Sequence, residues 1–208
     1  WLLEGTLPKE TILLDPIDLI LITQGLSDHC HEDSLQTLSK SIPVICPSSA
    51  YKLIKSLHFK RINVVSPGIQ TNFNQLEVLT TCGAKIPSLE NGYIINSPSG
   101  SIYIEPHGFL DPEINNKKVN VAITPVINIG LPIFGNFIQG KTVLPEIIKR
   151  LNPSVIMSST VGGEIHFKGF INNFIKSEGT IEDASLSIGE KALFIDPTPY
   201  KKYHLNKS

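Results

Sequence analysis

The sequence predicts an α/β protein, arranged as a four-layer α/β/β/α sandwich in a single domain over residues 1–208. Two observations lead to this prediction. Short runs rich in Ile and Val alternate with segments at helical spacing near both ends of the chain, which is typical of strand–helix–strand units. Between them lie three strand-like runs joined by short turns, which indicates an antiparallel meander. A length of 208 residues is ample for one such core.

The first third of the chain has the pattern of a strand–helix alternation. The near-continuous apolar run at 18–23 predicts a buried strand. Acidic residues in the first turn and leucines three apart predict a helix over 32–40. The next expected elements are a strand at 44–46, a helix from 47 to about 57 and a strand at 62–65.

The middle and the end of the chain change character twice. A meander is expected at 76–81, 92–96 and 101–105, followed by a buried strand at 119–124. The segment 128–140, rich in Gly, carries two Phe and several Ile or Leu and is predicted to be a long apolar loop. Such a loop serves as a lid, as an oligomer or lipid contact, or packs on the core. Helices are expected at 142–151, 169–177 and 180–187, and strands at 154–158 and 192–195.

Composition excludes several classes of protein. Lys and Arg number 18 against 19 Asp and Glu, so no basic surface for nucleic acid is expected. With 41% hydrophobic and 18% charged residues, the chain is a folded one. No apolar run reaches about 18 residues, so no membrane span is expected. Three cysteines without a CxxC pair favour a reducing compartment, and hence the cytoplasm, over a disulfide scaffold.

The most unusual stretch of the chain is Thr23–Asp33, which contains Asp28, His29 and His31. It lies where the first buried strand ends and a helix begins, which is where open α/β sheets usually place ligand-binding groups. Three side chains within four residues are potential metal ligands. The alternative interpretation is a polar turn in which Asp28 or Ser27 caps the helix.

The sequence around this motif resembles the metallo-β-lactamase superfamily. Residues 20–31, Ile-Leu-Ile-Thr-Gln-Gly-Leu-Ser-Asp-His-Cys-His, are similar to the family signature T-H-x-H-x-D-H at the end of a strand. The additional His31 is similar to the branch that holds ascorbate-lactonase-like and phospholipase-D-like hydrolases. Segments 2–5, 101–108 and 123–126 resemble further family segments. The resemblance implies the αββα sandwich, with one or two N-terminal strands upstream of this sequence.

The resemblance also implies a metal site, which this chain does not complete. In the family two histidines of the signature bind a first metal, and their positions hold Gln24 and Leu26 here. The bridging Asp falls at Pro106, and the expected middle and last histidines are missing. Only Asp28 and His29 of the ligand set remain in place. A two-metal hydrolytic site of the standard kind is therefore not expected.

A rearranged site for one Zn, Fe or Mn ion is the first functional hypothesis. An ion with an open position activates water, so the protein would hydrolyse an ester, lactone, amide or phosphodiester of a small-molecule substrate. This hypothesis requires Asp28, His29 and His107 to converge on one cleft. The candidate metal ligands are Asp28, His29, His31, His107 and His166, and the candidate catalytic acids are Asp28, Glu105 and Glu164.

These residues also fit a structural interpretation, which supports other hypotheses. His107 suits a tight turn, Glu164 and His166 an exposed polar pair, and His31 a helix cap. The second functional hypothesis is a catalytically inactive fold relative that serves as a binding or assembly module. The third is an apolar-ligand or lipid-binding domain that uses loop 128–140.

Overall fold

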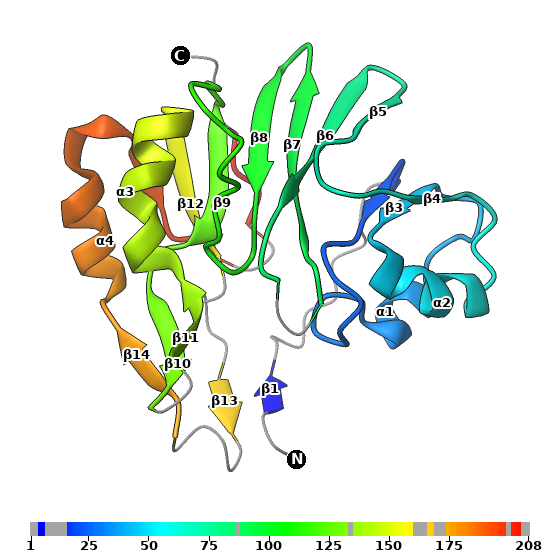
Figure 1. Cartoon of the computed structure of the whole chain (residues 1–208), viewed down its shortest axis with the longest axis horizontal. Coiled ribbons are helices and arrows are strands. Elements are labelled where there is room, and N and C mark those ends of the chain that lie inside the picture. Colours follow the sequence, from blue (N-terminus) through cyan, green and yellow to red (C-terminus); the bar gives the residue numbers. More distant parts are fainter. Residues whose placement is uncertain are drawn as a thin grey trace. The chain divides into compact units, whose positions relative to one another are not determined.

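The computed structural model describes residues 4–6, 16–85, 88–132, 135–159, 166–168, 174–198 and 201–204. The chain forms two compact units. Residues Leu13–Ser97 are the first unit, and Trp1–Ile12 together with Pro98–Ser208 are the second unit. Figure 1 labels most of the elements of both.

The first unit begins with a three-stranded parallel sheet in the order β2–β3–β4. A helical segment follows each of the first two strands, as a parallel sheet requires. Val44 and Ala50 are fully buried in the apolar cluster that joins this sheet to its helices. The elements are β2 (Ile20–Leu21), α1 (Glu32–Gln36), β3 (Val44–Cys46), α2 (Ser48–Ser56) and β4 (Ile62–Val64).

The rest of the first unit is an antiparallel arrangement of β5 (Gln70–Phe73), β6 (Leu76–Cys82) and β7 (Asn91–Ser97). Asn74 turns the β5–β6 hairpin with a φ of 51°, a left-handed conformation that asparagine tolerates. A second apolar cluster of Ile45, Val65, Val78 and Tyr93 contains residues from both sheets of this unit.

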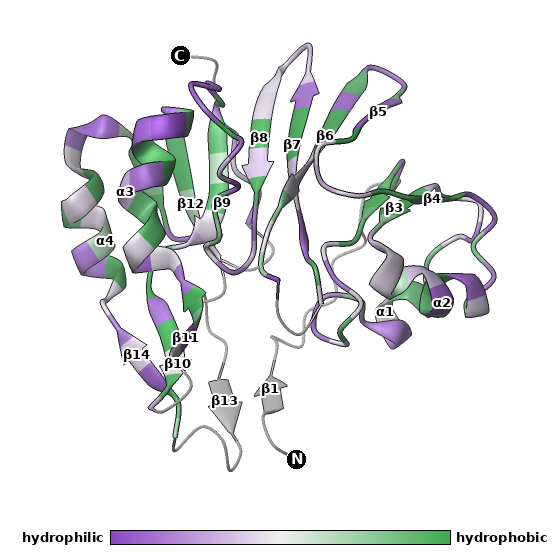
Figure 2. Ribbon diagram, viewed as in Figure 1, coloured by the Kyte–Doolittle hydropathy of each residue, from purple (hydrophilic) through white to green (hydrophobic). Residues whose placement is uncertain are grey.

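The second unit is built on parallel strands in the order β8–β9–β12–β15. Leu144, Ile156 and Ile188 belong to the apolar cluster between this sheet and its two long helices. Figure 2 shows hydrophobic stretches in β9 and β12, and both hydrophilic and hydrophobic residues in α3. The elements are β8 (Gly100–Ile104), β9 (Val121–Pro125), α3 (Gly140–Leu151), β12 (Val155–Ser159), α4 (Ile181–Ile188), the 3-10 turn η2 (Gly189–Lys191) and β15 (Leu193–Ile195).

Two smaller sheets complete the second unit. One has the order β11–β10–β14, and the other pairs β1 with β13. The strands are β1 (Glu4–Thr6), β10 (Asn128–Leu131), β11 (Gly135–Gln139), β13 (His166–Lys168) and β14 (Lys176–Glu178). No helix in the described part of the chain is both long and apolar enough to cross a membrane.

The prediction of a loop at 128–140 is wrong, because this segment forms the β10–β11 hairpin. A Cβ on Gly130 would lie 2.4 Å from the carbonyl oxygen of Gly135, so glycine permits the close pairing of the two strands. Phe137 of β11 keeps 44% of its surface exposed. The lid or oligomer contact expected for this segment stays a prediction.

Two predicted helices also differ from the structure. The helix expected at 32–40 ends at Gln36, where the Lys40 ammonium binds the carbonyl oxygens of Leu35 and Gln36. The helix expected at 169–177 is wrong at its end, because 176–178 is strand β14. Residues 169–173 of that prediction lie outside the described residues. The α/β class and most of the other predicted elements are confirmed.

Candidate active site

The loop after β2 is held against the first turn of α2. The backbone N–H of Gly25 donates to Ser49 Oγ over 3.1 Å. A Cβ at Gly25 would lie 2.4 Å from the Ser49 carbonyl oxygen, so only glycine allows this approach. The N–H groups of His29 and Cys30 both donate to the Leu26 carbonyl, at 3.0 and 2.7 Å. These bonds give residues 25–30 one compact conformation.

Residues at the start of β7 fix the other side of the same loop. The N–H of Asn91 donates to the Thr23 carbonyl over 2.8 Å, and the Tyr93 hydroxyl donates to the Ile22 carbonyl over 2.6 Å. Burial raises the pKa of Tyr93, which keeps this hydroxyl a proton donor. Since Glu90 directly precedes Asn91, these bonds bring its carboxylate to the loop that carries His29.

His29 has a polar group at each ring nitrogen. Its Nδ1 lies 2.9 Å from Thr23 Oγ1 and 3.4 Å from Glu90 Oε1, and its Nε2 lies 3.6 Å from Asp28 Oδ2. The side chain of His29 is 10% exposed and that of Glu90 is fully buried, whereas that of Asp28 is 71% exposed. The buried Glu90 carboxylate and the Thr23 hydroxyl therefore orient the ring through Nδ1, and the exposed Asp28 carboxylate lies beside Nε2.

This donor set fits a single metal ion. Imidazole and carboxylate ligands without thiolate suit zinc, iron or manganese. Two ligands at about 2.1 Å from a tetrahedral ion lie about 3.4 Å from each other. The 3.6 Å between His29 Nε2 and Asp28 Oδ2 is close to that spacing. The partners of Nδ1, Thr23 and Glu90, correspond to the outer groups that fix the orientation of a metal-binding histidine.

Gln24 and Leu26 stand where the family has the two histidines that bind its first metal, and they do not fit a metal ion. Gln24 is fully buried, and its Nε2 donates to the Ser88 carbonyl over 2.6 Å. Its Oε1 is buried without a hydrogen-bond partner in the described part of the chain. Leu26 offers no donor atom and is 39% exposed. An apolar side chain therefore occupies the place of the second histidine of the family signature.

In the second unit, the Glu105 carboxylate organises the loop that follows β8. It is fully buried and accepts hydrogen bonds from the backbone N–H groups of His107, at 3.1 Å, of Gly108, and of Phe109, at 2.8 Å. Gly108 has a φ of +76°, and a Cβ there would lie 2.7 Å from the Gly140 nitrogen. His107 is half-buried, and its carbonyl accepts from the Gln139 N–H over 2.8 Å. Glu105 thus has a defined structural role as an anchor for this loop.

The other predicted site residues have different surroundings. His31 is the N-cap of α1, where its Nδ1 accepts a hydrogen bond from the Ser34 N–H over 3.3 Å. His166 lies in β13, in register with Thr6 of β1. Glu164 lies outside the described residues. The expected convergence of Asp28, His29 and His107 stays a prediction.

Thr23 and Glu90 were not identified from the sequence. Thr23 is part of the family signature but carries no metal-binding role there. Glu90 precedes a strand without any motif around it, and 60 residues separate it from His29. The available signal was an isolated acid directly before the strand-like run with Tyr93, Ile94 and Ile95, where a buried carboxylate needs a partner.

The fold and the histidine–carboxylate arrangement can now be set beside known families. The beta-lactamase superfamily domain matches residues 5–159, and the chain belongs to this family. The predicted metallo-β-lactamase superfamily membership and fold class are thereby confirmed. A search of curated proteins finds no match.

Solved structures of this fold differ in chemistry. An isothiocyanate hydrolase from Delia radicum gut bacteria is 17% identical, with a TM-score of 0.62 over 88% of this chain and 74% of that one. The metallo-beta-lactamase fold protein YhfI from Bacillus subtilis is 10% identical, with a TM-score of 0.58 over 86% and 75%. CmlA, a diiron beta-hydroxylase from Streptomyces venezuelae, is 17% identical, with a TM-score of 0.54 over 73% and 37%. These likenesses establish the fold, and the chemistry has to be argued from the site.

Proposed function

We propose that this protein is a metal-dependent hydrolase that uses one ion, bound by His29 Nε2 and Asp28. The observation that carries the proposal is the environment of His29, whose two nitrogens face carboxylates at 3.4 and 3.6 Å. The fully buried Glu90 suits an orienting role, because it leaves Nε2 as the ligand atom. Family membership supports the same chemistry.

Each residue of this site has a defined task. A bound ion with an open position lowers the pKa of its water to about 7. Glu90 and Thr23 hold the imidazole through Nδ1 and compensate the charge placed on the ring. Asp28 presents one oxygen towards His29 Nε2, and the exposure of its side chain leaves the other oxygen able to accept a proton from the nucleophile. The substrates proposed are small esters, lactones, amides or phosphodiesters.

A site of this kind needs further ligands, and the sequence supplies the candidates. His107 and His166 remain the proposed additional imidazoles, with Glu164 as a further acid. His31 is left out of the proposed set, because its Nδ1 already caps α1. Glu105 is left out as a proton shuttle, since three backbone N–H groups use its carboxylate.

The metal content of purified variants tests the proposal. Wild-type protein is expected to carry about one zinc, iron or manganese ion per chain, measured by elemental analysis after dialysis. Asp28→Ala and His29→Ala should lose the ion, and Glu90→Gln should weaken its binding about 10- to 100-fold. His204→Ala is the matched control, because it removes an exposed imidazole near the C-terminus. His107→Ala and His166→Ala then report whether these residues contribute ligands.

Turnover completes the test. The metal-loaded protein is expected to cleave p-nitrophenyl acetate, bis(p-nitrophenyl) phosphate or a simple lactone, and both ligand variants should lose that activity. The hydrolase proposal is refuted if the wild-type protein binds none of the three metals while Asp28→Ala and His29→Ala fold normally.

The alternative is a catalytically inactive member of the fold that acts as a binding or assembly module. A specific observation favours it: two predicted site residues stabilise local structure. Glu105 anchors a loop, and His31 caps a helix. Their presence therefore needs no catalytic explanation. The metal analysis decides between the two functions.

Domain organisation and compartment belong to the same proposal. The family match at residues 5–159 includes parts of both units, which supports a single domain over 1–208. In the described part of the chain the buried Cys30 and Cys46 form no disulfide, which supports a reducing compartment such as the cytoplasm.

A further inference from the structure

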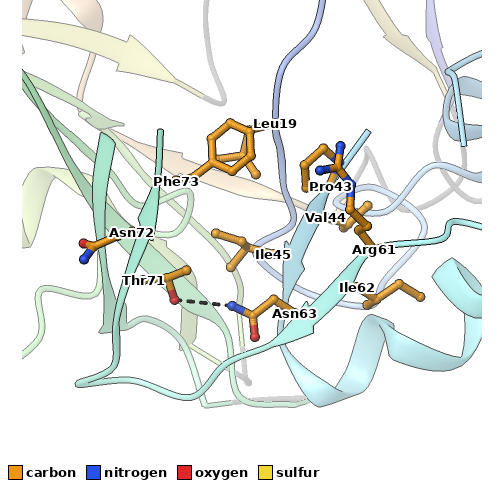
Figure 3. A pocket seen from close by; sticks show the side chains of 10 residues that line it. All are labelled: Leu19, Pro43, Val44, Ile45, Arg61, Ile62, Asn63, Thr71, Asn72 and Phe73. Carbon is orange, nitrogen blue, oxygen red and sulfur yellow. Dashed lines mark hydrogen bonds between the residues drawn. The ribbon is translucent and has the colours of Figure 1, made fainter. Parts of the chain in front are cut away.

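A pocket of about 300 Å³ opens in the first unit between the β2–β3–β4 sheet and the β5 strand. Figure 3 shows the ten side chains that line it. Three of them, Leu19, Pro43 and Arg61, directly precede β2, β3 and β4. The pocket therefore lies at the amino ends of these parallel strands, whereas the loop with Asp28 and His29 follows the carboxyl end of β2. The two sites are at opposite ends of one sheet.

Arg61 is exposed and gives this pocket a positive charge, and no acid is among the described residues that line the pocket. Among the described residues that line the pocket, it alone is charged. Its Nε and Nη2 both donate to the Ser41 carbonyl, at 3.1 and 2.8 Å. These two bonds fix the plane of the guanidinium through its Nε–Nη2 edge. Within the described part of the chain, the edge formed by Nη1 and Nη2 keeps one N–H on each nitrogen without a protein acceptor. Such an edge matches the two oxygens of a carboxylate.

The remaining lining is suited to a molecule with an apolar body. Leu19, Ile45 and Phe73 supply hydrocarbon surface. Thr71 accepts a hydrogen bond from Asn63 Nδ2 over 3.4 Å, so its hydroxyl proton is available for a second acceptor. A mostly apolar lining with a few polar groups is typical of small-molecule sites, and about 300 Å³ is at the lower end of their size.

We infer that this pocket binds a small monocarboxylate with a short apolar tail, with the carboxylate on the free edge of the Arg61 guanidinium and the tail against Leu19, Ile45 and Phe73. The positive charge of Arg61 selects a carboxylate as the head group of the ligand, and the hydrocarbon lining selects an apolar tail. This inference does not depend on the hydrolase proposal, because none of its residues belongs to the candidate active site.

Binding is measured by NMR titration of the full-length protein with hexanoate, following the backbone amides of Ile45, Asn63 and Thr71. Saturable shifts are expected for hexanoate. Acetate lacks the tail and inorganic phosphate lacks the apolar body, so each should bind about tenfold more weakly or worse. Hexylamine carries the opposite charge and should cause no saturable shift.

Variants assign the two parts of the site. Arg61→Gln is expected to weaken hexanoate binding about tenfold or more, since a charge-assisted pair is lost. Lys60→Gln removes the same charge one residue away and outside the lining, so it should bind hexanoate as wild type does. Phe73→Ala should weaken hexanoate but leave acetate unchanged. Amide spectra of each variant show whether the fold is retained.

Three results would overturn the inference. They are an absence of saturable hexanoate shifts in wild-type protein, equal effects of Arg61→Gln and Lys60→Gln, and phosphate binding as tight as hexanoate binding. Arg61→Lys keeps the charge without the planar edge, and should bind several-fold more weakly than wild type.

Discussion

The contact between Gly25 and the first turn of α2 provides the sharpest test of how the candidate active site is positioned. In Gly25→Ala the new Cβ would lie 2.4 Å from the Ser49 carbonyl oxygen, 2.5 Å from its carbonyl carbon and 2.9 Å from the Ala50 nitrogen. All three are backbone atoms, so no side chain can rotate away. The loop or the helix has to move by about 0.6 Å to bring the closest contact from 2.4 to 3.0 Å.

The expected cost follows from this geometry. Overpacking usually destabilises a protein by about 1–3 kcal/mol. Because this clash is with helix backbone, we expect Gly25→Ala to lower the free energy of unfolding by about 3 kcal/mol, at the upper end of that range. The same movement shifts Asp28 and His29, which lie three and four residues further along the loop. A displacement near 1 Å reduces catalysis about 100-fold in positioned sites. Metal binding and turnover should therefore fall together with stability.

The assay is urea denaturation followed by circular dichroism, combined with metal analysis of the folded fraction. Ser49→Ala is the matched control, because it removes only the 3.1 Å bond from the Gly25 N–H and adds no volume. It should cost about 1 kcal/mol. If Gly25→Ala unfolds within about 0.5 kcal/mol of wild type, the close approach of loop and helix is not as described and the reasoning fails.

Three further predictions test other parts of the structure. Glu105→Gln should destabilise the protein by about 2–4 kcal/mol in urea denaturation, because a neutral amide replaces the carboxylate that three N–H groups share. His31→Ala should lower stability by about 1 kcal/mol through loss of the α1 cap while metal content stays unchanged; a loss of metal would instead make His31 a ligand. Burial, and secondarily the nearby Cys30, raise the pKa of Cys46 from 9.0 to about 11, so the native state retains this proton more tightly than the unfolded state. The free energy of unfolding should therefore fall as the pH rises from about 9 to 11, and Cys46→Ala should flatten that fall.

Several elements could be predicted because their signals are local. Val44–Cys46 is a strand as expected, since a β-branched run bounded by prolines at 43 and 47 has few other conformations. The helix that follows matches its predicted position within about a residue at each end. Asp28 and His29 were identified as site residues because they belong to one short motif.

The failures share a different cause. Segment 128–140 contains the glycines of a loop, yet its strand β10 pairs both with the neighbouring β11 and with a distant strand at 176–178. Asn128 Nδ2 donates to Glu178 Oε2 over 3.0 Å across that pairing. A single-sequence pattern contains no information about a strand so far away. The same holds for Glu90, which reaches His29 only because the Asn91 N–H binds the Thr23 carbonyl.

The sequence by itself determined the class of this protein, its family resemblance and the loss of the first-metal histidines at Gln24 and Leu26. Only the tertiary structure decided how His29 is oriented and which carboxylate is buried beside it. It also assigned Glu105 to the anchoring of a loop. The physical reason is that helix and strand preferences act over a few neighbouring residues, whereas a hydrogen bond or an ion pair depends on which distant segments the folded core brings together.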